Sequence, residues 1–494
     1  MTHFYFSVEI EDILNFFFCV NLIIPVSIGY SKDKMVEELV KQRVGRTPLV
    51  RARRLEKELG FSKIYLKLEG NNPSGNCSDR LAYLIIRDAL TRNKKIISMS
   101  TYGNLGHSLS DLSKYFDVEC KFFVSSKRHI NKIKSLDLDH VDVIDCGTSY
   151  AKCVQMSRKM AKKNGWYDAN PGFANSVINM YAYSYIAKEI HRQSHEPIDT
   201  VFCQVFNGSS ISGLHLGFKE LWINEDIEVL PKLWAVGTTN GNAIIESFRK
   251  NKQEIQKLDP AQITKTKYCR HMVNGDCSNG QDALNALYDT YGKAVGVTDD
   301  ELITQGKRFK KLEKIRLSLR NAYPLAAFIK SVEKETISPG NHIIILDDGK
   351  VDLDIQVINK ADLSVSYSAF LHRLDDWLVE FSDPQDEMAE AVENAFEHGY
   401  VICAFERDTM VAIAILSRTR FDTFFPKYHL SYIATKKDVK GKGTATQLLQ
   451  KAIEVTQGDL SLHVETTNPR AIRLYEKMGF RKQYYRMIYK GPTE

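Results

Sequence analysis

Residues Asn71–Arg80 read NNPSGNCSDR, and the N-terminal part of the chain is organised around this stretch. It follows a strand-like segment, Ile64–Glu69, and precedes an amphipathic helical run, Leu81–Leu90. Glycine, proline and asparagine favour a turn, and a helix that begins directly after a turn offers its first N–H groups and side chains to a ligand. The pattern predicts a strand, a turn and a helix that together present a functional side chain.

The same stretch resembles the lysine motif of the fold-type II pyridoxal-phosphate (PLP) enzymes, such as threonine synthase and cysteine synthase, which reads N-P-[TS]-G-S-F-K-D-R. Asn72–Gly75 and Asp79–Arg80 match it, but Ser78 stands where the family has its Schiff-base lysine. A hydroxyl cannot form an imine with an aldehyde. We therefore expect a degenerate PLP-enzyme-like domain in which PLP is not covalently bound.

Strand-like and helical segments alternate from Val44–Leu49 onwards, which predicts an α/β fold of parallel sheets with helices on both faces. One helix start is marked strongly: Thr298 is placed as an N-cap, and Glu301 follows at the third helical position, as in a capping box.

Other motifs of the PLP family recur in altered form. Ser100–His107 resembles the loop that holds a substrate carboxylate, and the resemblance implies that Asn104 contacts the cofactor. Phe206–Gly213 resembles the phosphate loop, with phenylalanine in place of its first glycine. Asn321 replaces the serine that bonds the pyridine nitrogen, and Asp347 replaces a hydroxyl residue. The resemblance thus implies a vestigial PLP site comprising Ser78, Asn104, Asn207, Gly208, Ser209, Ser210 and Asn321.

A second pattern follows Asp354, in which strands and helices lead into the glycine loop Val439–Ala445 (VKGKGTA) and then into Asn468–Phe480 (NPRAIRLYEKMGF). These stretches resemble two signatures of the GNAT superfamily of acetyl-CoA-dependent N-acetyltransferases. Bare backbone amides at a helix start suit a pyrophosphate. The resemblance implies an α/β domain with a mixed sheet and acetyl-CoA as co-substrate.

In that superfamily the motif tyrosine often protonates the departing thiolate, and this role carries over to Tyr475, which could instead be a core residue. His429 and Glu465 are candidate bases, but both could be structural, with water as the base. We expect no metal site. Acetyl-CoA contacts are expected from Ile433, Thr435, Lys440, Gly441, Lys442, Gly443, Thr444, Ala445 and Asn468.

The composition is that of a globular protein: 494 residues, 43% hydrophobic and 26% charged, with a formal charge of +6. So small a charge predicts no nucleic-acid partner. The nine cysteines are scattered without a C-x-x-C pair, which predicts reduced thiols and a cytoplasmic location. Polar residues interrupt the apolar N-terminal segment, so we expect no membrane span. We expect an extension over residues 1–34, a PLP-enzyme-like domain over 35–352 and a GNAT domain over 353–494.

Together these patterns predict an N-acetyltransferase that acts on an amine of a small molecule. The acceptor is expected to be amino-acid-like, because Ser100–Gly106 retains much of a carboxylate-binding loop. Two alternatives stay open: a bifunctional enzyme that also carries out PLP chemistry on amino acids, and a non-catalytic scaffold. The resemblance also leaves open a homodimer formed through the first domain.

Overall fold

The computed structural model describes residues 40–482, apart from 42, 62, 102, 125–138, 148–149, 173–174, 195, 260, 262, 264, 267, 270–271, 352, 407–408, 422–424 and 440–443. No helix within these ranges is both long and apolar enough to cross a bilayer.

The N-terminal part contains two main sheets. The six-stranded sheet is parallel except at its β1 edge, and the four-stranded sheet is parallel throughout. In spatial order the first sheet comprises β1 (Leu49–Arg51), β2 (Ile64–Leu68), β11 (His342–Leu346), β7 (Thr200–Gln204), β8 (Lys232–Thr238) and β9 (Lys293–Val297). The second comprises β5 (Val141–Asp145), β4 (Glu119–Val124), β3 (Ile96–Ser100) and β6 (Tyr167–Asp168).

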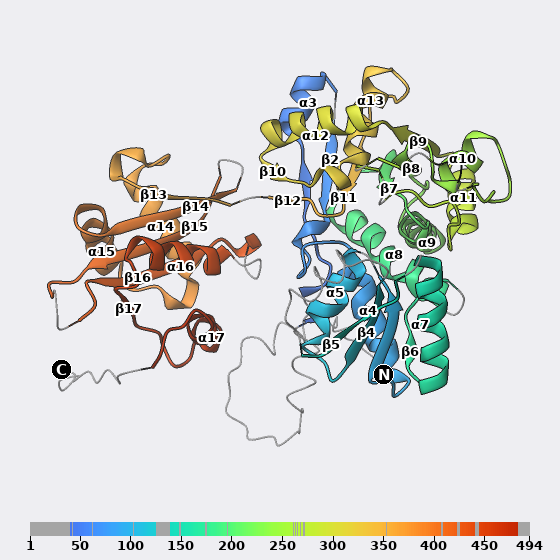
Figure 1. Cartoon of the computed structure of the whole chain (residues 1–494). Coiled ribbons are helices and arrows are strands. Elements are labelled where there is room, and N and C mark those ends of the chain that lie inside the picture. The colour runs from blue at the N-terminus through green and yellow to red at the C-terminus, as the bar shows by residue number, and fades with distance from the viewer. Residues whose placement is uncertain are drawn as a thin grey trace, which may run out of the picture.

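Helices cover both faces of the six-stranded sheet (Figure 1). Successive strand residues point to opposite faces: Cys203 packs into the cluster formed by α4, α5 and α8–α11, whereas Phe202 packs against α3, α12 and α13. The helices are α3 (Arg53–Leu59), α4 (Asp79–Thr91), α5 (Asn104–Ser113), α7 (Tyr150–Asn164), α8 (Ser176–Gln193), α9 (Ser209–Ile223), α10 (Ala243–Arg249), α11 (Gly280–Asp289), α12 (Asp299–Glu313) and α13 (Tyr323–Glu333).

Two of these helices make an unusually close contact. A Cβ atom at Gly213 of α9 would lie 2.3 Å from the Met180 carbonyl oxygen of α8, and one at Gly217 would lie 2.4 Å from that of Ser184. Only glycine allows the two backbones to approach so closely. Gly213, which belongs to the phosphate-loop-like motif, therefore has a packing role in this fold.

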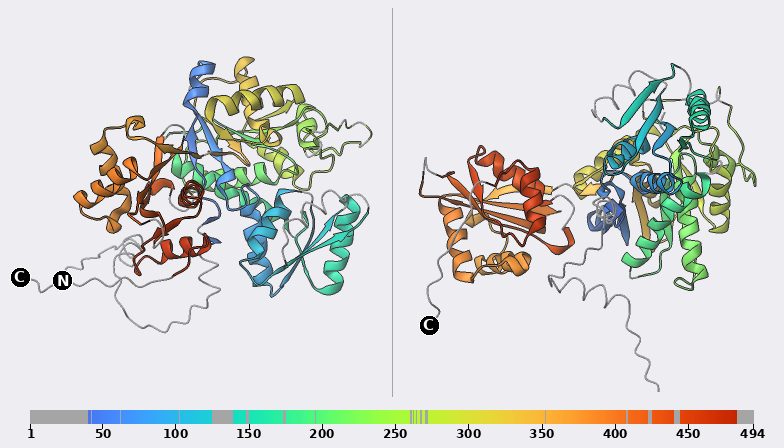
Figure 2. Two further views of the ribbon diagram at one scale, coloured as in Figure 1. Left: turned by 60° about the vertical axis from the view of Figure 1, so that its left-hand side comes forward. Right: turned by 90° about the horizontal axis from the view of Figure 1, so that it is seen from below.

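The C-terminal part forms a separate mixed sheet with helices on both faces, coloured orange and red in Figures 1 and 2. The short ladder β10 (Ile315–Arg316) and β12 (Lys350–Val351) precedes it. Its strands, in spatial order, are β13 (Leu353–Ile358), β14 (Tyr400–Glu406), β15 (Thr409–Arg418), β16 (Tyr428–Thr435) and β17 (Leu460–Leu462). Helices α14 (Tyr367–Leu378) and α15 (Gln385–Glu397) pack on one face, and α16 (Thr444–Val455) and α17 (Pro469–Lys477) on the other.

The mixed sheet is antiparallel except for the β16–β17 pair, which is parallel. A bulge interrupts the β15–β16 ladder, because Leu430 pairs with Leu416 whereas Tyr432 pairs with Ile415. An extra residue reverses which face the following side chains occupy. Leu430 therefore packs with α16 and α17, and Tyr432 with α14 and α15. The expected α/β class, with parallel sheets followed by a mixed sheet, is confirmed.

Candidate active sites

The turn after β2 is held by backbone and side-chain hydrogen bonds. It begins with the short helix η1 (Glu69–Asn71) and ends at the start of α4. The Gly45 N–H donates to Asn72 Oδ1 at 2.8 Å, and Asn72 Nδ2 donates to the Glu69 carbonyl at 2.9 Å. The Cys77 N–H donates to the Asp347 carbonyl at 3.0 Å. The turn is thus tied to two other segments distant in sequence.

Four buried charged side chains lie beneath this turn. Arg80 contacts Glu69 at 2.7 Å and Glu189 at 2.8 Å, and Lys67 contacts Glu189 at 2.7 Å. Burial would raise the pKa of Glu189, but the Arg80 and Lys67 cations hold it well below its usual range. Burial lowers the pKa of Lys67 despite its carboxylate partner. These paired charges fix the start of α4 to α8 and β2.

Ser78 lies directly before α4, buried among other polar side chains. Its N–H donates to Asn76 Oδ1 at 3.0 Å. Burial raises the pKa of the Cys77 thiol, as do the Asp347 and Glu69 carboxylates. Burial also raises the pKa of Tyr183, a shift that a hydrogen bond with Ser78 reduces. Burial, with Asp348 and Glu69 nearby, raises the pKa of Asp347 to about 7. The groups around Ser78 are therefore protonated or close to protonation at neutral pH.

Two loops at the ends of strands complete this region. Asn104 is exposed at the start of α5. Ser100 precedes it at the end of β3, and its buried Oγ lacks a hydrogen-bond partner among the residues described. Tyr102 lies outside the described residues. Gly208, at φ +98°, precedes α9, and a Cβ there would lie 2.3 Å from the Asn279 carbonyl oxygen. The loop at Gly208 is thus a compact helix start that requires glycine.

The hydroxyls and amides of the second loop are largely engaged within the fold. Asn207 Oδ1 accepts from the Ser209 N–H at 3.2 Å, Ser209 Oγ donates to Asn279 Oδ1 at 2.9 Å, and Ser210 Oγ donates to the Gln204 carbonyl at 3.1 Å. Gln204 Nε2 donates to Asn321 Oδ1 at 3.2 Å. Five of the residues predicted for the PLP site therefore lie close to Gln204, the last residue of β7: Asn207, Gly208, Ser209, Ser210 and Asn321.

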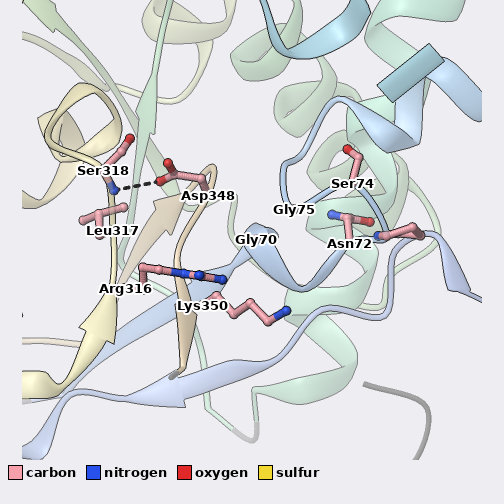
Figure 3. A pocket seen from close by; sticks show the side chains of 10 residues that line it. Gly70, Asn72, Ser74, Gly75, Arg316, Leu317, Ser318, Asp348 and Lys350 are labelled. Atoms are coloured by element: carbon pink, nitrogen blue, oxygen red, sulfur yellow. Dashed lines mark hydrogen bonds between the residues drawn. The ribbon is translucent and has the colours of Figure 1, made fainter. Parts of the chain in front are cut away.

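A cavity of about 510 Å³ opens beside the Asn72–Gly75 turn. On the facing wall, the side chains of Arg316 and Lys350 extend side by side toward the turn, and the Ser318 N–H donates to Asp348 Oδ1 at 3.4 Å (Figure 3). The cavity combines a cationic wall with the polar edge of the turn.

In the C-terminal part, strands β16 and β17 pair at only three positions, Tyr428–Leu460, His429–Ser461 and Leu430–Leu462. Strand β16 then continues to Thr435, so the two strands separate. Ile433 packs on the face of α16 and α17. The divergence leaves the backbone of the β16 end without a β17 partner in the described part of the chain.

The second signature forms α17, which packs on the same face of the sheet as Ile433. Asn468 caps α17 by accepting the Ala471 N–H on Oδ1 at 3.0 Å. Tyr475 is buried in the same cluster as Leu430 and Leu460, and burial raises its pKa to about 12. Thr444 is buried at the start of α16, followed by half-buried Ala445. The expected contacts Lys440, Gly441, Lys442 and Gly443 lie outside the described residues.

Comparison with known proteins agrees with both halves of this geometry. Residues 40–348 match the family of pyridoxal-phosphate dependent enzymes. The chain belongs to that family. Residues 368–480 match the acetyltransferase (GNAT) family, so a PLP-enzyme domain is joined to a GNAT domain.

The relatives support the first assignment. The threonine synthase of Methanocaldococcus jannaschii is 27% identical over 324 residues, which are 65% of this chain and 78% of that protein. The threonine synthase of Methanosarcina acetivorans is 23% identical over 335 residues, 67% of this chain and 80% of that protein. A threonine deaminase isoform from Solanum lycopersicum has a similar structure, with a TM-score of 0.52 at 19% identity over 64% of this chain and 84% of that one.

In the PLP-enzyme domain, the loop that resembles the phosphate loop opens α9 at Gly208, where only glycine fits. At the position that resembles the pyridine end, the buried Oε1 of Gln204 lies beside Asn321 and lacks a partner within the ranges described. PLP, where bound, supplies an electrophilic aldehyde and an electron-withdrawing ring. Ser78 offers a hydroxyl where attachment requires an amine, so the donor set does not fit covalent binding.

In the GNAT domain, the two candidate bases differ in their surroundings. Glu465 is exposed and accepts from Thr467 Oγ1 at 3.0 Å. His429 contacts both Ser461 and His463, at 3.0 and 3.1 Å. Neither signature predicts a role for His463, because a single histidine beyond a short strand matches no motif. The parallel register of β16 and β17 brings it beside His429.

Proposed function

We propose that the protein is an acetyl-CoA-dependent N-acetyltransferase that acts on an amine of a small molecule. The observation that carries this proposal is the separation of β16 from β17, with Tyr475 buried on one face of this sheet and Asn468 at the start of the same helix, α17. Strand edges that separate leave N–H and C=O groups available to an extended, amide-containing arm such as pantetheine. Asn468 Oδ1 is used for capping, which leaves Nδ2 as a donor to the same arm.

Tyr475 supplies the proton for the leaving group in this proposal. Its raised pKa keeps the hydroxyl protonated at neutral pH. Burial favours neutral groups over charged ones, so a thiolate formed in the same surroundings gains from protonation. The amine that attacks the thioester carbonyl must first lose a proton, which requires a base within reach of the amine nitrogen.

The PLP-enzyme domain, over about residues 35–352, binds or presents a ligand rather than forming an imine with PLP. Ser78 motivates this assignment, as do Asn321 and Asp347 in place of hydroxyl residues. An amino-acid-like acceptor is favoured because its carboxylate suits the helix start at Asn104, and because Arg316 and Lys350 give the nearby cavity a positive wall. The GNAT domain then spans about residues 353–494, and residues 1–34 form an extension.

The cellular location of the protein is inferred from its cysteine thiols. Eight cysteines of the described part, including Cys146, which is only partly buried, are free. Unpaired cysteines are typical of a reducing compartment, and we infer a cytoplasmic protein. A homodimer formed through the PLP-enzyme domain stays a prediction.

Isothermal titration of the whole protein with acetyl-CoA tests the proposal. Gly443→Glu should weaken binding by about 2–4 kcal/mol, or about 30- to 1000-fold, because it removes space and adds negative charge near the pyrophosphate. Tyr475→Phe should leave binding unchanged and lower turnover by about 10- to 1000-fold. No affinity for acetyl-CoA or another acyl-CoA at millimolar concentration would replace this function with a binding-only scaffold.

A separate experiment concerns PLP. Protein treated with borohydride as purified, with no PLP added, should carry no pyridoxyl group, because reduction fixes only an imine. A pyridoxyl-lysine peptide found by mass spectrometry would favour the bifunctional enzyme instead. Reversible binding of PLP or phosphate at the loop around Gly208 is compatible with the proposal.

A further inference from the structure

Three side chains form a hydrogen-bonded chain where β16 and β17 begin to separate. Ser461 Oγ lies 3.0 Å from Nδ1 of His429, and Nε2 of His429 lies 3.1 Å from Nδ1 of His463. The imidazole centroids are 4.6 Å apart at an interplanar angle of 52°. The contact between Nε2 of His429 and Nδ1 of His463 is within hydrogen-bond distance, so one ring can donate a proton to the other.

Ser461, at one end of these three side chains, fixes which atom donates in each hydrogen bond. Ser461 Oγ also lies 3.3 Å from the carbonyl oxygen of Tyr428, which can only accept. A serine hydroxyl has one proton. If that proton goes to the carbonyl, both contacts of the hydroxyl are hydrogen bonds; if it goes to His429, the contact between the two oxygens has no proton.

The hydroxyl proton is therefore assigned to Tyr428, and the remaining positions follow in order. Ser461 Oγ accepts from Nδ1–H of His429, whose Nε2 is then an acceptor. Nδ1–H of His463 donates to that Nε2. A neutral imidazole carries one N–H, so Nε2 of His463 is a proton acceptor.

These three side chains lie on the face of the sheet opposite to Tyr475. Leu430, Leu460 and Leu462 pack toward α16 and α17. Side chains alternate along a strand, so His429, Ser461 and His463 lie on the face of α14 and α15. Tyr475 packs with the leucines on the other face. A base and an acid on opposite faces match a thioester held between the two strands.

We propose that His463 is the catalytic base that takes the proton from the acceptor amine, and that His429 and Ser461 are positioning residues that set its tautomer. This rests on the acetyltransferase function proposed above. The ammonium gives one proton to Nε2 of His463. The amine lone pair forms the C–N bond, and the C–S bond breaks with its electron pair on sulfur. Tyr475 protonates the thiolate and recovers the second proton of the amine nitrogen, so one proton leaves through His463 to solvent.

The tautomers can be measured without any substrate. In the full chain labelled with ¹⁵N-histidine, long-range ¹H–¹⁵N correlations distinguish Nδ1–H from Nε2–H imidazoles. We expect the Nδ1–H form for both His429 and His463, and in Ser461→Ala a shift of His429 toward a mixture of tautomers. An Nε2–H form of His463 in the unmodified protein would overturn the proposal, whether or not acetyl-CoA binds.

The rate gives the second test, with L-amino acids and their amides as amine probes and free thiol as the readout. In His463→Asn, the amide nitrogen can still donate to His429, but the basic nitrogen is lost. We expect kcat to fall by about 100- to 1000-fold, with the Kd of acetyl-CoA unchanged. His398→Asn is the matched control, since His398 is 64% exposed in the same domain beside Glu397.

The outcomes separate the two proposals. If His463→Asn keeps the kcat of the control, the base assignment fails while the acetyltransferase function stands. If the unmodified protein does not bind acetyl-CoA, the function fails, and the assignment of His463 as its base fails with it. Ser461→Ala should lower kcat less than His463→Asn does, and an equal or larger loss would contradict a positioning role.

Discussion

Replacing Glu189 by glutamine should destabilise the PLP-enzyme domain by about 3–5 kcal/mol, the usual cost of breaking a buried ion pair. The Glu189 carboxylate accepts from Lys67 Nζ at 2.7 Å, from Arg80 Nη1 and Nη2 at 2.8 Å each, and from the Arg46 N–H at 2.8 Å. A glutamine keeps the shape but turns one acceptor into a donor. The Lys67 side chain is 0% exposed and that of Arg80 is 4% exposed, so water cannot replace the lost charge.

The loss of stability expected for Glu189→Gln can be measured by thermal unfolding. At about 2–4 °C per kcal/mol for a large domain, the loss corresponds to a fall in Tm of about 6–20 °C. Glu220→Gln is the matched control, because it removes a carboxylate that pairs with neighbouring Lys188 at 2.6 Å but is 42% exposed. Exposed pairs contribute at most about 1 kcal/mol. A Tm of the Glu189 variant within about 2 °C of the control would refute this reasoning.

The pH dependence provides an independent check on the same residue. Because its neighbours hold the pKa of Glu189 well below the usual value, its contribution is present above about pH 4.5 and is lost as the pH falls toward the folded-state pKa. The stability difference between the protein and the variant should therefore narrow on acidification. A difference that stays constant would mean that the charge of Glu189 does not stabilise the fold.

Three further predictions concern other parts of the chain. The pKa of Asp347 is about 7 in the fold and about 3.9 in an unfolded chain. The free energy of unfolding, measured in urea, should therefore fall as the pH rises from about 4 to about 7. Asp347→Asn should lack that fall, and equal slopes would contradict the assignment. Gly217→Ala should destabilise by about 1–3 kcal/mol, because its Cβ would lie 2.4 Å from the Ser184 carbonyl oxygen; an unchanged Tm would show that α8 and α9 can move apart. A fragment of residues 353–494 should unfold cooperatively alone, whereas aggregation without a melting transition would indicate an obligate interface.

Local features of the fold could be predicted because their causes lie within a few residues. Thr298 and Glu301 form the capping box that their spacing predicts, with Thr298 Oγ1 accepting from the Glu301 N–H. The strand over Ile64–Leu68 and the helix that begins at Asp79 also match their patterns. Motif spacing also predicts that Ser78 ends the turn, and α4 begins at the next residue.

The partners of these residues were decided by tertiary structure. Glu189 is 142 residues from Thr47, yet it accepts the Thr47 N–H at 3.2 Å. Asp347 and Tyr183 surround Ser78 from elements that no local pattern connects. Whether a buried charge is paired depends on which strands and helices become neighbours, and periodicity does not encode that.

The same limit applies to the GNAT domain. Its motifs predict roles for Asn468 and Tyr475, because each signature is a short run of residues. They left His429 undecided and did not identify His463, since the relation between the two depends on the parallel pairing of β16 with β17, in which His429 faces Ser461. A shift of one residue would turn the alternate side chains to the other face and break the chain. Amino-acid sequence thus determined which chemical groups are present, whereas strand register decided which of them meet.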